Sequence, residues 1–548
     1  MRHLVALLAA TLLVAPAGHA QARDASRAAA ALDAGTYRAH LAFLADDALE
    51  GRAPATRGGV LAAKYVAAQF ERLGLEPAGD DGGWFHRIPV VQLAGTPELR
   101  TSAGEPLRFR DDFVLWSMRD TAEVMLAAPL VFVGYGITAP EATWDDFAGT
   151  DVRGKVLVVL VNDPGLQDPA LFRGKELTYY GRWTYKLEEA ERRGAAAILL
   201  VHTTESATYP WSTVVGSWSG PQVRLARGTG GPLLAAGWLT EDAARRIVSA
   251  GGHELDDLVR RAARPGFRAI PLGDLTASAR VRSTVTHSET MNVLGRLPGR
   301  GPRAHEAVLV GGHYDHLGIG VPVRNDSIYN GALDNASGTA GVLALAEALV
   351  QSGVQPGRSL LFMAFGAEES GLIGSQAFAA RPTLPLRDLV AMLNLDVLNL
   401  LGRTRDIGAL GRDQSSLGAV FEAAARAEGL RVADDPEARL RGSFFRSDHF
   451  PLVRVGVPAL SLEGGLDYVD RPAGWGKVQQ ERYTAERYHQ PQDELLPDYT
   501  PEGALQQLRV VLRVALAVAE APDQPIWHAN SEFAAAGRAR VSPKGPSR

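Results

Sequence analysis

Between about Ser283 and Glu520, short unbroken apolar segments alternate with longer segments of helical periodicity. An unbroken apolar segment is typical of a strand buried on both faces, because side chains along a strand point alternately to its two sides. This alternation predicts an α/β domain with a mixed, mostly parallel sheet flanked by helices. The expected strands are Ala307–Gly311, Leu360–Phe365, Leu389–Leu395 and Ala459–Leu462, and the expected helices include Gly338–Leu349, Leu417–Leu430 and Glu502–Glu520.

The chain of 548 residues is too long for a single core, so two or three domains are expected. Strand-like segments such as Pro129–Tyr135 and Lys155–Val161, with many glycines and tryptophans, indicate a small β-rich module inserted into the α/β domain. The predicted division is an N-terminal part of the main domain over 29–126, the inserted module over 127–271, the main α/β domain over 275–525, and a disordered tail over 534–548.

The first residues have the pattern of a secretory signal peptide. A basic start is followed by an apolar run, Leu4–Ala17, and by an A-x-A-like site, which predicts removal of residues 1–22 with cleavage near Ala20 or Ala22. A membrane anchor is the alternative, but the run is shorter than the roughly 20 residues that a spanning helix needs. We therefore expect a periplasmic or secreted protein with no membrane span after cleavage.

Charge and cysteine content narrow the classes of function. The formal net charge of -5 gives no sign of nucleic-acid binding. The chain has no cysteine, so disulfides are excluded and metal ligands are restricted to His, Asp and Glu. That ligand set suits a catalytic zinc site better than a structural one.

Candidate metal ligands follow the predicted strands. His313 comes after Ala307–Gly311, Glu369 after Leu360–Phe365, and Asp396 ends Leu389–Leu395. Asp334 lies in a glycine-containing loop before the next helix, and His489 lies in a loop before a proline. In open α/β sheets, ligands bind beyond the carboxyl ends of the strands, so these side chains are expected to meet at one edge of the sheet.

Two zinc ions would balance this cluster. Their four positive charges exceed the three negative charges of Asp334, Glu369 and Asp396, and the difference favours binding and ionising a water. Glu368, next to Glu369, is then placed to move the proton, provided that a turn after Gly366 lets both side chains reach the cleft. Asp315, two residues after His313, is expected to orient the imidazole. Co²⁺ or Mn²⁺ can substitute for zinc in such a site.

The motifs that contain these residues resemble those of the co-catalytic zinc exopeptidases, which include secreted bacterial aminopeptidases and glutamate-carboxypeptidase-type enzymes. The motifs are HYDH (His313–His316), NGALDNASG (Asn330–Gly338), GAEESG (Gly366–Gly371), NLDVLN (Asn394–Asn399) and YHQPQDE (Tyr488–Glu494).

The resemblance implies a role for each residue. His313 and Asp396 would bind one zinc, Glu369 and His489 the other, and Asp334 both. It also implies Glu368 as general base and acid, Asp315 behind the first histidine, and Tyr488 as a hydrogen-bond donor to the oxyanion. The Asp334–Asn335 peptide bond is often cis in such proteins, and the inserted module resembles a protease-associated domain. The segment Ser447–Phe450 resembles a stretch of the aminopeptidase branch, and structural support is expected of it.

The expected substrate is a peptide with a free terminus. An aminopeptidase is favoured by the resemblance, with a glutamate-carboxypeptidase-type dipeptidase or carboxypeptidase as the alternative. A carboxypeptidase needs fixed cations, and Arg441 and Arg446 are candidates. Two other classes remain open: a single-zinc glutaminyl cyclase, which is an acyl transferase, and a non-catalytic receptor on the same scaffold. The sequence leaves the oligomeric state undetermined.

Overall fold

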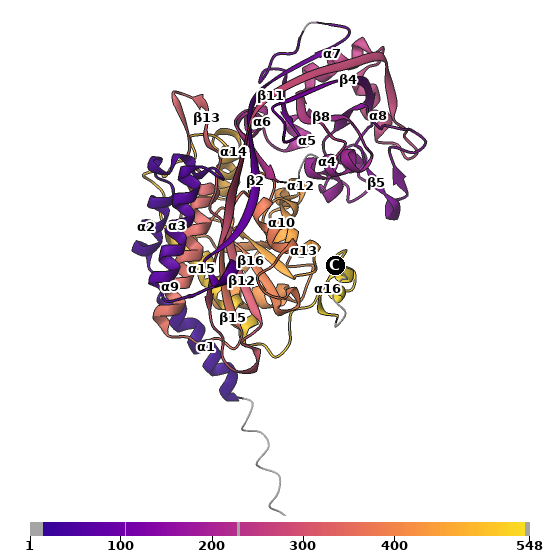
Figure 1. The fold of residues 1–548 in the computed structure, drawn as a ribbon. Helices are drawn as coiled ribbons and strands as arrows, with labels where there is room; N and C mark the ends of the chain where they lie inside the picture. The colour runs from indigo at the N-terminus through magenta and orange to yellow at the C-terminus, as the bar shows by residue number, and fades with distance from the viewer. Residues whose placement is uncertain (1–14, 105, 227–230, 543–548) are drawn as a thin grey trace, which may run out of the picture.

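The computed structural model describes residues 15–104, 106–226 and 231–542, which form two lobes joined by a pair of long strands (Figure 1). The expected signal peptide lies mainly on residues 1–14, outside the described residues. Helix α1 (Ala15–Ala30) runs through the expected cleavage site. It packs against α9 (Ser337–Ser352) and α15 (Glu502–Glu520) of the main lobe. No helix within the described ranges combines the length and apolarity needed to cross a membrane.

The main lobe is built on the predicted α/β sheet. Strands β12, β15, β16 and β19 are mutually parallel, with β12 between β15 and β16, while β17 and β11 add antiparallel neighbours. Its strands are β12 (Ala307–His313), β15 (Ser359–Phe365), β16 (Leu389–Asn394), β17 (Asp406–Leu410), β18 (Arg431–Val432) and β19 (Ala459–Gly464). The mixed, mostly parallel sheet expected from the sequence is therefore confirmed.

Helices cover both faces of this sheet. One face carries α2 (Ala34–Leu44), α3 (Arg57–Arg72), α9 (Ser337–Ser352), α11 (Leu417–Ala427) and α15 (Glu502–Glu520), and the other carries α10 (Ile373–Ala380), α13 (His449–Arg454) and α16 (Ala534–Val541) (Figure 1). In β15, Leu360, Phe362 and Ala364 pack on the first face. Leu361, Met363 and Phe365 pack on the second. This two-sided burial explains why the strand reads as an unbroken apolar run.

The inserted lobe has its own core. Its elements are β3 (Phe113–Ser117), β4 (Glu123–Phe132), β7 (Val156–Leu160), α4 (Trp183–Arg192), β8 (Ala197–His202), α5 (Thr204–Ala207), α6 (Trp211–Trp218), β9 (Gln222–Leu225), β10 (Ala235–Thr240), α7 (Glu241–Ala250) and α8 (Leu255–Ala262). The expected limits of 127 and 271 are too narrow, because Leu99 and Phe113 on one side and Val281 on the other belong to this core. Helices make up more of the lobe than a β-rich module implies.

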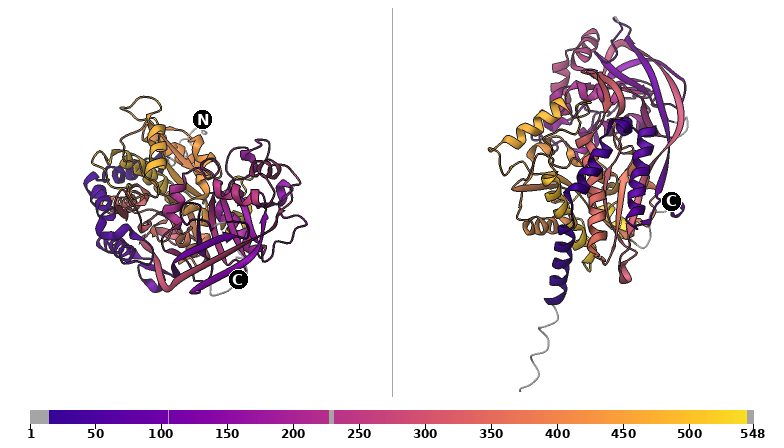
Figure 2. Two further views of the ribbon diagram at one scale, coloured as in Figure 1. Left: turned by 90° about the horizontal axis from the view of Figure 1, so that it is seen from above. Right: turned by 90° about the vertical axis from the view of Figure 1, so that its left-hand side faces the viewer.

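Two strands connect the lobes. β2 (Phe85–Thr101) and β11 (Ile270–Leu297) pair antiparallel along their length, from Phe85 opposite Val293 to Thr101 opposite Ala277. Figure 2 shows this ribbon running along one edge of the molecule from one lobe into the other. In the main lobe β11 also pairs with β15, and in the inserted lobe with β4, so one continuous sheet passes through both.

The tail is a correction to the sequence prediction. Residues 534–541 form α16 rather than a disordered segment. The buried guanidinium of Arg540 donates hydrogen bonds to the carbonyl oxygens of Leu389 (2.8 Å) and Gly456 (3.0 Å). The basic composition that suggested a solvated tail thus includes an arginine that satisfies backbone carbonyls of the main lobe. The last expected tail residues, 543–548, lie outside the described ranges.

Candidate metal centre

The five expected ligands converge at the carboxyl edge of the parallel strands. His313 ends β12, Glu369 and Asp396 follow β15 and β16, and Asp334 lies in the turn Ala332–Ala336 before α9. His489 reaches the same place from the loop after α14 (Trp475–Glu486). The peptide bond between Asp334 and Asn335 is cis, as the resemblance implies.

The distances divide the cluster into two halves that share Asp334. The Nε2 atom of His313 lies 3.3 Å from Oδ1 of Asp334 and 3.4 Å from Oδ1 of Asp396. The Nε2 atom of His489 lies 3.4 Å from the other oxygen of Asp334, Oδ2, and 3.0 Å from Oε2 of Glu369. The two carboxylate oxygens of Asp334 therefore face different histidines.

This donor set fits divalent metal ions. Ligand atoms about 3.3 Å apart are the spacing that tetrahedral coordination at about 2.0 Å from zinc produces. The charges agree. Burial lowers the pKa of His489, but Glu369 and Asp334 outweigh burial and raise that pKa to about 10. The pocket thus favours positive charge beside its carboxylates, and bound cations would meet that demand in place of protons.

A sharp turn brings both glutamates to the site. Ala367, directly after β15 and Gly366, has a left-handed backbone conformation with φ of 61°. Glu368 and Glu369 consequently both line the same cavity, which confirms the expectation that the turn lets neighbouring side chains reach it. Burial raises the pKa of Glu368 well above its usual range, and Glu369 and Asp448 add to this although His313 opposes it. Its surroundings therefore make Glu368 a carboxylate that binds a proton readily.

The side chain of Asp315 makes hydrogen bonds other than the one expected from the sequence. Its carboxylate accepts backbone N–H groups from Glu368 (3.0 Å) and Glu369 (3.3 Å), and lies 3.9 Å from the His313 ring. The Nδ1 atom of His313 instead donates to the backbone carbonyl of Asp315 at 3.1 Å. That bond leaves Nε2 of His313 free for Asp334 and Asp396. Asp315 thus fixes the turn that carries the glutamates, while its main chain orients the histidine.

Several supporting residues were missed from the sequence. Asp493, within YHQPQDE, accepts the backbone N–H groups of Leu333 (3.1 Å) and Asp334 (3.0 Å). His316, within HYDH, places Nδ1 2.7 Å from Oε1 of Glu369. Both residues lie inside motifs that contain a proposed ligand, so their nearness to that ligand in the sequence could have identified them. Ser217 contacts Nδ1 of His489 at 2.8 Å, and no sequence signal marked it because α6 belongs to the inserted lobe.

The segment Ser447–Phe450 lies beneath the centre. Asn394, two residues before Asp396, donates to Ser447 Oγ at 2.8 Å. Asp448 and His449 are fully buried. Burial raises the pKa of Asp448 to about 7. These contacts agree with the structural support expected of the segment.

A cavity of about 320 Å³ opens over the centre and has walls from both lobes. Tyr488 lines it, with its ring centroid 3.9 Å from that of His489. Burial, Asp334 and Glu369 raise the pKa of Tyr488 well above its usual range, so its hydroxyl keeps its proton and can donate. Both candidate arginines line the cavity. Arg441 pairs with Asp435 at 2.7 Å, whereas the partners of Arg446 among the described residues are neutral.

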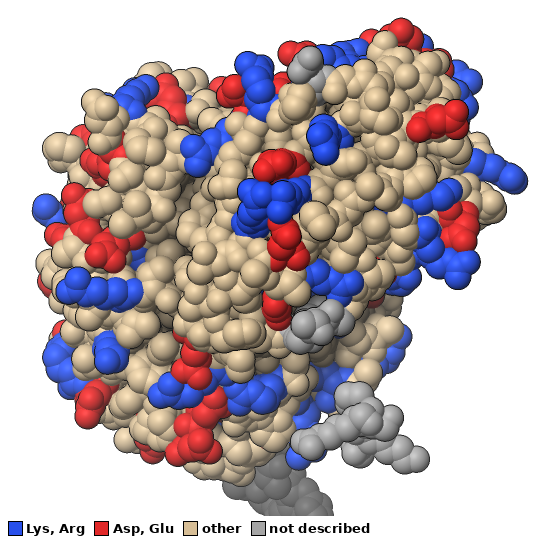
Figure 3. Space-filling view, turned by 45° about the horizontal axis from the view of Figure 1, so that its top comes forward, with Lys and Arg blue, Asp and Glu red and all other residues tan. Residues whose placement is uncertain are grey.

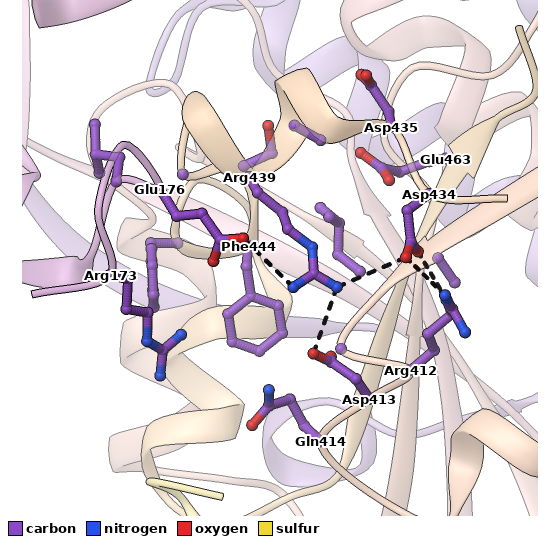
Figure 4. A pocket seen from close by; sticks show the side chains of 18 of the residues that line it. Arg173, Glu176, Arg412, Asp413, Gln414, Asp434, Asp435, Arg439, Phe444 and Glu463 are labelled. Atoms are coloured by element: carbon purple, nitrogen blue, oxygen red, sulfur yellow. Dashed lines mark hydrogen bonds and ion pairs between the residues drawn. The ribbon is translucent and has the colours of Figure 1, made fainter. Parts of the chain in front are cut away.

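A second, smaller cavity of about 80 Å³ adjoins the first. Figure 4 shows Arg439 between Glu176 of the inserted lobe and two acidic side chains of the main lobe. Its terminal nitrogens lie 3.7 Å from Glu176, 3.6 Å from Asp413 and 3.7 Å from Asp434. This cavity holds paired charges and belongs to the contact between the lobes.

The fold and the cluster together define an α/β protein with a candidate metal site of His and acidic side chains. Residues 292–515, which contain all five clustered residues, match the model of peptidase family M28. This match confirms the expected resemblance to co-catalytic zinc exopeptidases over that segment.

Similar proteins support the same class. Leupeptin-inactivating enzyme 1 of Streptomyces exfoliatus is 30% identical over 189 residues, which are 34% of this chain and 39% of that protein. Leucine aminopeptidase 1 of Grosmannia clavigera is 29% identical over 193 residues, 33% of this chain and 45% of that protein. The chain thus spans less than half the length of these curated relatives. The solved structure of an aminopeptidase from Aneurinibacillus sp. strain AM-1 has the same fold, with a TM-score of 0.52, 20% identity, and coverage of 92% of this chain and 97% of that one.

Proposed function

We propose that the protein is a dinuclear zinc aminopeptidase that acts outside the cytoplasm. The observation that carries this proposal is the placement of Asp334, whose two carboxylate oxygens face His313 and His489 at 3.3 and 3.4 Å. One ion would be held by His313, Asp396 and Asp334, and the other by His489, Glu369 and Asp334. The matched relatives named as aminopeptidases support the reaction class, and the amino-terminal pattern of the sequence supports export.

Two zinc ions bound here would supply Lewis acidity toward a peptide carbonyl and would lower the pKa of a water. The protein's own groups then move the protons. Glu368 is buried at the edge of the cluster, so it is positioned to accept a proton from the attacking water and to deliver it to the leaving nitrogen. The hydroxyl of Tyr488, which keeps its proton, would donate a hydrogen bond to the developing oxyanion.

The test compares peptide amides that have a free amino terminus with the same peptides blocked at that terminus. Hydrolysis of the free form alone, lost with a chelator and restored by zinc, is the expected result. Cleavage from the carboxyl end of amino-blocked peptides that have a free terminal carboxylate would favour a carboxypeptidase. Cyclisation of amino-terminal glutamine would favour the cyclase class, and a folded, metal-loaded protein without turnover would favour a receptor.

A further inference from the structure

The cavity over the metal centre has a positively charged wall. Arg182 enters it from the turn before α4 of the inserted lobe, and Arg446 enters from the segment before α13 of the main lobe. Glu368 and Asp396 line the same cavity. The space next to the candidate metal centre therefore contains two guanidinium groups that the proposed chemistry does not use.

Arg182 is buried and has no ionic partner within the described ranges. Only 9% of the residue is exposed, and its Nε atom has no hydrogen-bond partner in those ranges. No carboxylate there lies within 4.0 Å of this side chain. Other buried arginines of the chain are satisfied: Arg358, for example, pairs with Glu306 and donates to the carbonyls of Val518 and Ala521. Burying an unpaired guanidinium is costly, so its retention in a cavity points to a ligand.

Arg446 is held in place by neutral groups. Its Nε donates to the carbonyl of Arg441 and its Nη2 to the hydroxyl of Thr208, both at 2.8 Å, and its guanidinium lies 5.4 Å from the ring centroid of Tyr209. Like Arg182, it has no carboxylate within 4.0 Å in the part of the chain that the structure describes. Burial and the charge of Arg446 lower the pKa of Arg182 to about 10, so Arg182 is cationic at neutral pH.

The surroundings of the pair also suit an anion. Trp183 and Thr184, the first residues of α4, line the cavity, and no side chain caps that helix. The amino end of a helix attracts negative charge through its free N–H groups. Glu463 lines the cavity too. Its carboxyl interacts electrostatically with Asp435 and Arg441, and it forms no ion pair with Arg182 or Arg446. The unbalanced positive charge is thus available to a ligand from outside.

We propose that Arg182 and Arg446 bind the free terminal carboxylate of a short peptide whose amino end lies at the metal centre. This inference rests on the proposed function and specifies its substrate class: peptides of a few residues with both ends free. The cavity of about 320 Å³ is at the small end of ligand sites, which are roughly 300–1,000 Å³. Planar guanidinium groups bind carboxylates through two parallel hydrogen bonds, which gives them both strength and orientation.

The experiment measures kcat/KM for three substrates: a leucyl tripeptide with a free carboxylate, the same tripeptide as its amide, and an amide whose last residue is Glu. We expect the free acid to exceed the plain amide about tenfold or more, mainly through KM. In Arg182→Met and Arg446→Met this acid-to-amide ratio should fall toward one. Arg426→Met is the matched control and should keep the ratio, because Arg426 is exposed on α11 and its one ion pair in the described part of the chain is with Glu422.

The thermal midpoint separates a ligand-binding role from a structural one. Because removing an unpaired buried charge relieves its desolvation, Arg182→Met should melt at or above the wild-type temperature. A large fall in its midpoint, with an unchanged ratio in Arg446→Met, would overturn the proposal. So would a wild-type ratio near one, and a Glu-terminated amide that matches the free acid would overturn the chain-end assignment. Chelator-sensitive hydrolysis with equal kcat/KM for the free acid and the amide would contradict this inference alone. No hydrolysis of any substrate would contradict the proposed function as well.

Discussion

Replacing Arg52 with methionine should destabilise the main lobe more than any other single arginine removal near the site. Arg52 is fully buried, and its guanidinium donates to four backbone carbonyls: Tyr314 (2.7 Å), Asn330 (2.5 Å), Gly331 (3.0 Å) and Leu44. Burial lowers its pKa to about 10, with Asp315 and Asp493 opposing this, so it remains charged. Tyr314 follows His313, and Asn330 and Gly331 precede the turn of Asp334. Arg52 therefore ties together two of the segments that carry proposed ligands.

The magnitude follows from these four bonds. A buried carbonyl left without a donor costs about 1–3 kcal/mol, so simple addition gives roughly 4–12 kcal/mol. Relaxation of the surrounding structure makes the loss smaller than this sum, and so does the removal of a charge whose burial is unfavourable. Breaking a buried charged network typically costs about 3–5 kcal/mol. We expect a loss of about 4 kcal/mol, a large share of the roughly 5–15 kcal/mol typical of a folded domain. Urea unfolding followed by circular dichroism would show it as a lower midpoint.

Arg72→Met provides the control for Arg52→Met. Arg72 is in the same lobe, but its side chain is 51% exposed and makes one ion pair, with Glu347 at 2.6 Å. Losing such a pair costs less than about 1 kcal/mol. Arg52→Lys should recover only part of the loss, because an ammonium cannot reach four carbonyls arranged around a planar fork. Equal unfolding midpoints for Arg52→Met and Arg72→Met would refute the reasoning.

Four further outcomes are expected. Glu368→Gln should keep its metal by elemental analysis but lose about 10²–10⁴-fold in kcat, since only the proton acceptor is removed; normal turnover would disprove that role. Asp334→Ala should lose both metal and activity, because both histidines face this carboxylate; two retained ions would contradict it. Ser217→Ala should weaken zinc binding about 10- to 100-fold in chelator competition, because Nδ1 of His489 loses its partner; unchanged affinity would make the contact incidental. Burial lowers the pKa of His449 to about 4, so the unfolded state takes up the proton first and stability is lost as pH falls from about 6.5 toward 4. His449→Phe should flatten that part of the pH–stability curve, and an equally steep curve would exclude His449 as the cause.

The main lobe could be predicted because its strands are buried on both faces. Such strands give continuous apolar runs with polar residues at their carboxyl ends, and both signals are local in the sequence. The inserted lobe was harder to delimit. β2 and β11 each continue from one lobe into the other, so composition does not change where the core changes. Leu99 and Val281 belong to the inserted core although neither lies near a break in the pattern.

The distribution of charge over the surface does not follow from the net charge of -5. Figure 3 shows acidic and basic side chains interspersed over the face that it presents. By contrast, the prediction of a disordered tail was wrong for α16. The guanidinium of Arg540 donates hydrogen bonds to the carbonyl oxygens of Leu389 and Gly456, and these acceptors lie far away in the sequence. Composition describes a segment in isolation and carries no information on such distant acceptors.

The site shows the same division between local and distant information. Residues that follow the strand ends were singled out as proposed ligands. His316 and Asp493 were missed although they lie inside the motifs, and Ser217 was missed because it belongs to the other lobe. Ser217 touches His489 at 2.8 Å, and the backbone of the neighbouring Gly216 lies so near the His489 carbonyl that a Cβ there would come within 2.5 Å of it. Gln490, which follows His489, donates a hydrogen bond from Nε2 to the carbonyl oxygen of Ser212 at 3.1 Å. Because α6 thus holds the loop of a proposed ligand, docking of the inserted lobe and completion of the metal centre are physically coupled. A change that separated the lobes would therefore be expected to weaken the half of the site that contains His489 before the half that contains His313, whose contacts lie within the main lobe.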